Sequence, residues 1–129
     1  MLCAVLIPKL QERFAGRGLR IDSAPSPCAV FPAVHPEFGD IQIYDEGDEL
    51  TVVAGHFTHG HFSNYDDELS VEQKAEKITD GVVHFLEEVF ADEVAFWGAH
   101  ESAGGWHKRG ERSDWQKAAR EFVWSGPLP

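Results

Sequence analysis

The segment from Val71 to Ala91 constrains the fold more than any other part of the chain. Ser70 and Gln73 form the capping-box pair that marks the start of a helix. Apolar side chains then recur every third or fourth residue, which is the spacing of one helical face: Ala75, Ile78, Val82, Phe85, Leu86 and Val89. A helix with one apolar stripe must bury that stripe against a second apolar surface. We therefore expect an architecture of two layers.

A β-hairpin earlier in the chain offers the second apolar surface. Apolar and polar residues alternate over Ile41–Tyr44 and over Leu50–Ala54, and the turn residues Asp45–Asp48 separate the two runs. A four-residue turn predicts that Ile43 pairs with Leu50. One face of the hairpin then carries the side chains that should cover the helix: Ile41, Ile43, Leu50, Val52 and Ala54.

Weaker patterns complete the order of elements. They predict a helix over about Ala4–Arg17, an edge strand at Ala29–Val34, a central strand at Val94–Trp97, a loop at Gly104–Gly110 and a helix from Ser113 to Phe122. The first helix tolerates Pro8 only in its first turn. The predicted order is roughly αβββαβα. It describes one α+β domain over residues 1–129, with a mainly antiparallel sheet and the long helix packed on one face.

The charge of the chain is strongly acidic and unevenly distributed. Twenty-two acidic residues stand against eleven basic ones, which gives a formal net charge of −11. Residues 37–93 hold sixteen of the acids and two of the bases. Such a surface repels phosphate backbones, so we expect no binding of nucleic acid. The acidic middle segment could attract a basic protein or divalent cations, or it could serve solubility alone, which is the most common reason for such a charge.

The cysteines and the apolar segments bear on the cellular compartment. Two cysteines, Cys3 and Cys28, are a thin basis for a disulfide in a chain of 129 residues. The apolar run at Met1–Ile7 is too short for a signal peptide, and no stretch approaches the length that spans a bilayer. We therefore expect reduced cysteines, a cytoplasmic location and no membrane partner.

A histidine-rich segment is the first candidate site. His56, His59 and His61 fall within six residues, and Asp66 and Asp67 follow them. Imidazole and carboxylate are the usual ligands of zinc and related transition metals. In an uninterrupted strand His59 and His61 share the face of Val53 and Phe57, whereas His56 lies on the core face, so all three converge only across a bulge. Histidines that only cap or pack are the alternative.

A basic loop is the second candidate site. Trp106, His107, Lys108, Arg109 and Arg112 form a compact group beside an aromatic ring. Such a group could hold an anionic ligand or the carboxylates of a partner. The alternative, which we favour, is an exposed basic loop that balances an acidic chain.

Two classes of function follow from these features. The favoured class is a non-enzymatic interaction protein without a cofactor, which neutralises a basic protein as immunity proteins and antitoxins do, or which forms a homodimer. The hairpin face that carries Tyr44, Val53 and Phe57 would serve such binding. The alternative is a metal-dependent hydrolase, with a divalent metal such as zinc held by His59 and His61, with Asp66 or Asp67 and, across a bulge, His56.

Overall fold

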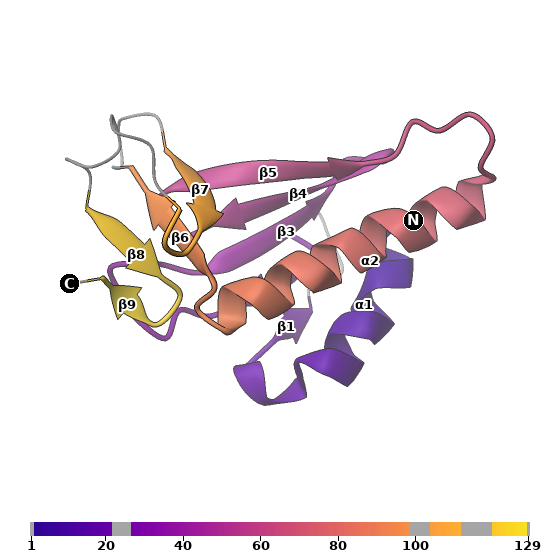
Figure 1. The fold of residues 1–129 in the computed structure, drawn as a ribbon. Coiled ribbons are helices and arrows are strands. Elements are labelled where there is room, and N and C mark those ends of the chain that lie inside the picture. The colour runs from indigo at the N-terminus through magenta and orange to yellow at the C-terminus, as the bar shows by residue number, and fades with distance from the viewer. Residues whose placement is uncertain (1, 22–26, 99–103, 112–119, 129) are drawn as a thin grey trace.

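The computed structural model describes residues 2–21, 27–98, 104–111 and 120–128, and these ranges form an α+β fold (Figure 1). The helices are α1 (Leu2–Arg13) and α2 (Val71–Phe90), and a short 3-10 turn (Ala15–Arg17) follows α1. A five-stranded antiparallel sheet has the order β1 (Arg20–Ile21), β2 (Ala29–Phe31), β3 (Ile41–Asp45), β4 (Glu49–Ala54), β5 (Thr58–Ser63). A four-stranded antiparallel sheet has the order β7 (Gly105–Lys108), β6 (Val94–Trp97), β8 (Glu121–Val123), β9 (Gly126–Pro127).

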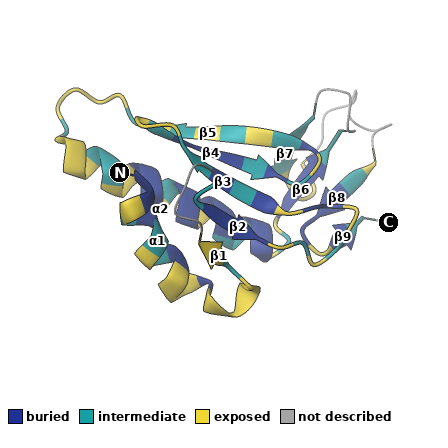
Figure 2. Ribbon diagram, turned by 180° about the vertical axis from the view of Figure 1, so that it is seen from behind, coloured by how far each residue is buried: buried dark blue, intermediate teal, exposed yellow. Residues whose placement is uncertain are grey.

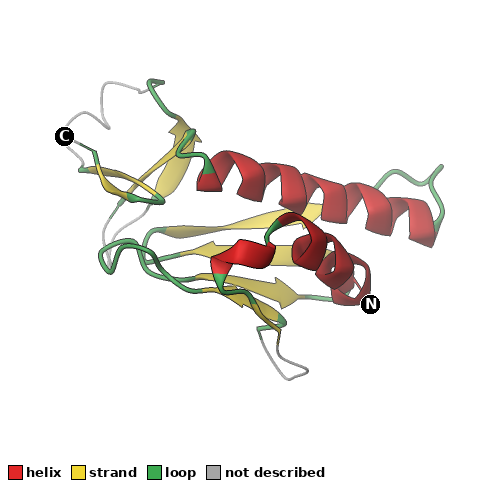
Figure 3. Cartoon of the chain, turned by 90° about the horizontal axis from the view of Figure 1, so that it is seen from below, coloured by secondary structure: helices red, strands yellow, loops and turns green. Residues whose placement is uncertain are grey.

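The long helix predicted from residue 71 is confirmed as α2. Its capping box is complete, because the Ser70 hydroxyl accepts from the Gln73 N–H at 3.1 Å and the Gln73 side chain accepts from the Ser70 N–H at 2.8 Å. The apolar stripe of α2 packs with α1 on one face of the five-stranded sheet (Figure 3). Exposed positions lie along the outward sides of both helices (Figure 2).

The hairpin β3–β4 supplies the predicted apolar face, but its register differs from the prediction. Ile43 pairs with Val52 rather than Leu50, and Asp45 pairs with Leu50. The turn is tighter because Gly47 adopts a φ of 99° and its N–H donates to the Asp45 carboxylate at 2.9 Å. A shift of two residues keeps every side chain on its face, so the predicted core residues are still buried.

The first helix also differs from its predicted bounds. The regular helix ends at Arg13, and Pro8 lies in its interior rather than in its first turn. Proline lacks the N–H that would bond to the carbonyl of Ala4. Both residues are exposed, so water can solvate that carbonyl, while Leu6 and Leu10 on the opposite side are completely buried.

The expectation of one sheet is wrong, because the C-terminal strands form a second one. The strand predicted at residues 94–97 is central, as β6, but between β7 and β8 of the smaller sheet. The predicted loop Gly104–Gly110 contains β7. The helix predicted from Ser113 lies mostly outside the described residues, and its last position, Phe122, lies in β8. Aromatic side chains join the two sheets: Phe38, Phe57, Phe96, Phe122 and Trp124.

Cys3 and Cys28 form a disulfide that joins the start of α1 to the residue before β2. The expectation of reduced cysteines is therefore wrong. Their Cα atoms lie 6.6 Å apart because Cys3 packs over the sheet, and sequence spacing gives no measure of such a distance.

The strand β2 is also not an edge strand, since the short strand β1 pairs with its outer side. Among the described residues, no helix combines the length and the apolar character that a membrane crossing requires.

Candidate functional site

The histidine segment does not form one uninterrupted strand. The chain reverses at Gly55–Phe57, and β5 runs back antiparallel to β4. Gly55 adopts a φ of 53°, and a Cβ atom there would overlap the carbonyl oxygen of Phe38. The reversal places Phe57 in the aromatic core, so its predicted position on the outer face is wrong.

His59 and His61 lie next to each other on the outer face of β5, as the alternation predicted. Their ring centroids are 5.1 Å apart, and both side chains are exposed. The Nδ1 atom of His61 lies 3.1 Å from the Thr51 hydroxyl and 3.4 Å from the Glu49 carboxylate, both on β4. This pair of imidazoles is tied to the neighbouring strand.

The other predicted metal ligands lie elsewhere. His56 lies in the β4–β5 turn, where its ring approaches Gly39. Its backbone N–H donates to the Phe38 carbonyl at 3.0 Å. Asp66 lies in the connection after β5 and accepts from the Glu68 N–H at 3.0 Å, and the neighbouring Asp67 is exposed. Among the described residues, no three His, Cys, Asp or Glu side chains are placed so that they could hold a metal ion together.

The predicted basic loop divides between two faces of β7. The Trp106 ring packs on Phe85 and covers Gly60, where an added side chain would overlap the indole. His107 points to the other face and lies 2.6 Å from the Glu121 carboxylate. Lys108 and Arg109 border a small cavity of about 380 Å³ together with three acidic residues: Glu88, Asp92 and Glu93. Arg112 lies outside the described residues.

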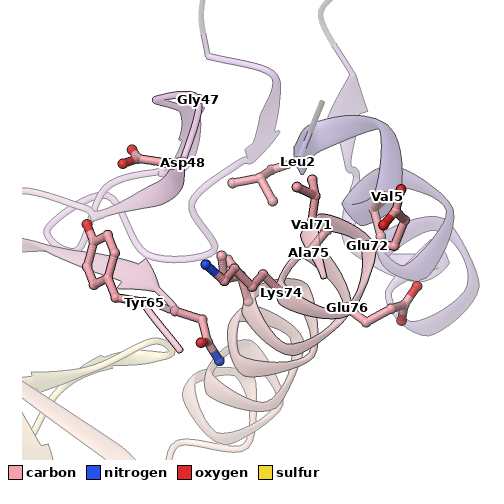
Figure 4. Close-up of a pocket in the computed structure, with 12 residues that line it drawn as sticks. Leu2, Val5, Gly47, Asp48, Tyr65, Val71, Glu72, Lys74, Ala75 and Glu76 are labelled. Carbon is pink, nitrogen blue, oxygen red and sulfur yellow. The ribbon is translucent and has the colours of Figure 1, made fainter. Parts of the chain in front are cut away.

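A larger cavity is a groove at the opposite end of the molecule, and sequence reasoning missed it. It measures about 690 Å³ and lies between the start of α1, the β3–β4 turn and the start of α2 (Figure 4). Apolar side chains form much of its wall: Leu2, Val5, Tyr65, Val71, Ala75 and Ile78. Val71 is 80% exposed and Tyr65 is 69% exposed, so the groove presents apolar surface to solvent.

The charged side chains at the groove are mainly acidic. Asp48, Glu72 and Glu76 line it, and Lys74 is its basic lining residue. The adjoining β5–α2 connection adds further exposed acids at residues 66–68. The groove therefore combines an apolar floor with an acidic rim.

Lys9 fixes the helix pair that forms one wall of the groove. Its ammonium lies 2.7 Å from Glu76, 2.7 Å from the Thr79 hydroxyl and 2.8 Å from Asp80. Burial of the Lys9 side chain lowers its pKa, but hydrogen bonds to Asp80 and Glu76 outweigh that effect and raise the pKa above its usual range. Lys9 therefore holds α1 against α2 through charged hydrogen bonds.

Asp45 fixes the start of α1 at the other wall. Its carboxylate accepts from the Cys3 N–H at 3.0 Å, which is one of the N–H groups without a partner inside the helix. Burial of the carboxyl raises its pKa, but the backbone hydrogen bonds from Cys3 and Gly47 outweigh burial and lower the pKa below its usual range. Asp45 thus caps the helix from a strand 42 residues away.

One signal in the sequence could have pointed to the groove. Val71 is the first residue of α2 and lies four residues before Ala75, so it extends the apolar stripe one turn beyond its predicted start. The sequence shows this apolar residue at the helix start, shortly after Tyr65, but the structure leaves it 80% exposed. Only the approach of α1 turns these two side chains into the wall of a cavity.

Comparison with known proteins identifies no function. Any argument about function therefore rests on the groove, on the histidine segment and on the predicted basic loop. The chain matches no protein-family model, no curated protein and no solved structure.

Proposed function

We propose that this protein is a non-enzymatic binding module that takes a basic segment of another protein into the groove between α1 and α2. The observation that carries the proposal is the combination of exposed apolar side chains with an acidic rim in one cavity. Protein interfaces have this anatomy, with an apolar centre that is surrounded by polar and charged groups.

The apolar part of the groove supports a partner with apolar anchors. Tyr65 and Val71 are among the most exposed large apolar side chains of the described chain, and both border the same cavity. Burying such surface contributes about 25 cal/mol for each Å² removed from water. Tyrosine is also one of the residue types that contribute most to binding energy at interfaces.

The charge of the chain supports a basic partner. The net charge of −11 and the acids at the groove rim both attract Lys and Arg side chains. Attraction between exposed charges is screened by salt, so binding should weaken as ionic strength rises. Such charge-driven binding of a basic partner is the kind of neutralisation that the sequence led us to compare with immunity proteins and antitoxins.

A pair of synthetic peptides tests the proposal. One is an amphipathic helix of lysine and leucine, and the other has glutamate at every lysine position. We expect the basic peptide to bind, with NMR shifts at Leu2, Tyr65 and Val71, and to bind more weakly at high salt. The acidic peptide should not bind. Equal binding of both peptides, or shifts that map to another surface, would contradict the proposal.

Matched variants locate the binding surface. Tyr65→Ala should weaken peptide binding about tenfold, since large side chains at the centre of an interface contribute that much. Val34→Ala changes an exposed apolar residue that does not line the groove, and it should leave affinity unchanged. Glu72→Lys should weaken binding and reduce its salt dependence, whereas Glu111→Lys, an exposed position that also does not line the groove, should do neither.

The metal-dependent hydrolase stays a prediction that metal analysis can test. Such a site needs a third ligand beside His59 and His61. Among the described residues, no His, Cys, Asp or Glu side chain is placed to be that ligand. Zinc retained by untagged protein, together with a rise in melting temperature on adding zinc, would favour the hydrolase.

A further inference from the structure

Three features that commonly keep a sheet edge from pairing, namely proline, formal charge and shortness, are missing from the edge strand β5 of the described chain. Within the described chain its strand neighbour is β4 alone. Native edges are commonly blunted by proline, by charged side chains or by shortness. The opposite edge of this sheet follows that rule, because β1 has two residues and contains Arg20. By contrast, β5 has six residues and contains neither proline nor a formally charged side chain.

The register shows which backbone groups face the open edge. The Glu46 N–H donates to the Glu49 carbonyl, and the Gly55 N–H donates to the Asp40 carbonyl, each at 2.9 Å. Odd-numbered residues of β4 therefore bond toward β3. Since bonding direction alternates along an antiparallel strand, even-numbered residues of β4 bond to even-numbered residues of β5. The backbone groups that point outward are those of His59, His61 and Ser63.

Side chains leave most of these groups accessible. The His61 ring is turned back onto β4 by Thr51 and Glu49, so it does not cover its own N–H and carbonyl. The His59 carbonyl accepts one long hydrogen bond, 3.4 Å, from the Thr58 hydroxyl. Unpaired groups of this kind along a strand form a template for another strand.

We propose that a second copy of this chain pairs with β5, antiparallel and about a two-fold axis at His61. This register places His61 opposite the partner's His61, and His59 opposite the partner's Ser63. It is the symmetric register that uses the outward groups of all three residues at once. The two five-stranded sheets then continue into one another across the axis.

Side chains on the inner face fit the same register. Gly60 lies opposite the partner's Phe62, and the exposed edge of Trp106 lies over Gly60. Phe62 is half-buried in one copy, where its ring packs on Phe85. Pairing would bring Phe62 of each copy against Trp106 of the other, which buries aromatic surface on both sides of the axis.

Charge distinguishes this association from binding in the groove. The net charge of −11 makes two copies repel each other, whereas β5 itself carries no formal charge. Salt screens that repulsion, so self-association should strengthen as ionic strength rises. Binding of a basic peptide in the groove should weaken under the same change.

The test is the molar mass of the full chain by light scattering over a wide range of concentration and salt. We expect a rise from 14.4 kDa toward twice that mass, and a greater rise at high salt. A chain that stays monomeric throughout, or that pairs only with added foreign peptide, would overturn the proposal. Failure of groove binding would not affect this result.

Two variants separate backbone pairing from side-chain effects. His61→Pro removes the outward N–H without touching the bonds to β4, so the central pair of hydrogen bonds is lost. We expect its dimer dissociation constant to rise about tenfold or more. His61→Ala keeps the N–H and should dimerise like the wild type. Equal loss in both variants would overturn backbone pairing.

A further variant and a direct measurement guard against misfolding. Ser63→Pro removes another outward N–H at the end of the strand, and it should also weaken the dimer if His61→Pro does not fold. In the wild type, hydrogen exchange at the amides of His59, His61 and Ser63 should slow as concentration rises. Exchange at these amides that is independent of concentration in a dimeric sample would assign the interface to another surface and overturn the proposal.

Discussion

Two residues, Gly55 and Asp45, fix the turns that place the histidine segment and the groove. Gly55 reverses the chain between β4 and β5 because only glycine fits beneath the Phe38 carbonyl. Asp45 ends β3 and at the same time accepts from the N–H of Cys3 at the start of α1. Gly55 acts through its backbone conformation, and Asp45 acts through the backbone N–H groups that donate to its carboxylate, so substitution at either position should lower stability.

Gly55→Ala should be strongly destabilising. The added Cβ overlaps a backbone oxygen in a left-handed conformation, so we expect a loss of about 3 kcal/mol or more in the free energy of unfolding. Gly16→Ala is the matched control, since an added Cβ there meets no atom within 4 Å. Chemical denaturation of both variants measures the difference. Similar stability of the two would show that the β4–β5 turn adopts another conformation.

Asp45→Asn should lower the free energy of unfolding at neutral pH. It should also make that free energy fall less steeply as the pH is lowered. Asparagine keeps an acceptor for the Cys3 N–H but removes the negative charge, and a charge at a helix N-terminus contributes about 0.3–1 kcal/mol. Because the folded pKa of Asp45 is lowered, its contribution is complete above the unfolded pKa and is lost as pH falls through the folded pKa. Urea denaturation at neutral and acid pH measures this, with Asp48→Asn in the same turn as the control. An unchanged slope of stability with pH would contradict the cap.

At the scale of elements, the packing of α1 on α2 creates the groove wall. Lys9 reaches from α1 to a completely buried hydroxyl and two carboxylates of α2, whereas the Arg13–Glu87 pair lies largely in solvent. Exposed ion pairs contribute little to stability, while charged hydrogen bonds in partly buried places contribute more. The two contacts therefore should differ in importance although both join the same helices.

Lys9→Met tests that difference. We expect a loss of about 1–2 kcal/mol in the free energy of unfolding, because Thr79 and two carboxylates lose a shared donor. Arg13→Met should cost less than about 0.5 kcal/mol. Thermal denaturation of each variant gives the comparison. A larger loss for Arg13→Met would mean that the outer ion pair holds the helices together.

Prediction from sequence succeeded where one element decided its own form. The capping box and the stripe fixed α2, and alternation fixed the buried face of the β3–β4 hairpin. The hairpin register was missed because alternation predicts only the face of the sheet on which each side chain lies. A shift of the pairing by two residues leaves every side chain on the same face, so the alternation cannot distinguish the two registers. The reversal at Gly55 was missed because its cause is a contact with Phe38 from another segment.

For the whole molecule, the disulfide joins segments that the sequence does not bring together. The bond between Cys3 and Cys28 ties α1 to the start of β2 and closes a loop of 25 residues. Disulfides persist mainly in oxidising compartments. The cytoplasmic location, which was predicted partly from the expectation of free thiols, loses that support and stays a prediction.

Reduction of the disulfide should lower stability. Closing a loop of this length stabilises a protein by about 3 kcal/mol in the chain-entropy view. We therefore expect the melting temperature to fall when a reductant is added. The double variant Cys3→Ser, Cys28→Ser should melt at that lower temperature with or without the reductant. A wild-type melting temperature that the reductant leaves unchanged would contradict the prediction.

The sequence by itself determined the α+β class, the identity and face of the main helix, and the acidic charge, because each depends on periodicity or on composition. Tertiary structure alone decided the split into two sheets, the disulfide, the groove and the open edge of β5. These features depend on distances between segments far apart in the chain, and local patterns carry no measure of such distances.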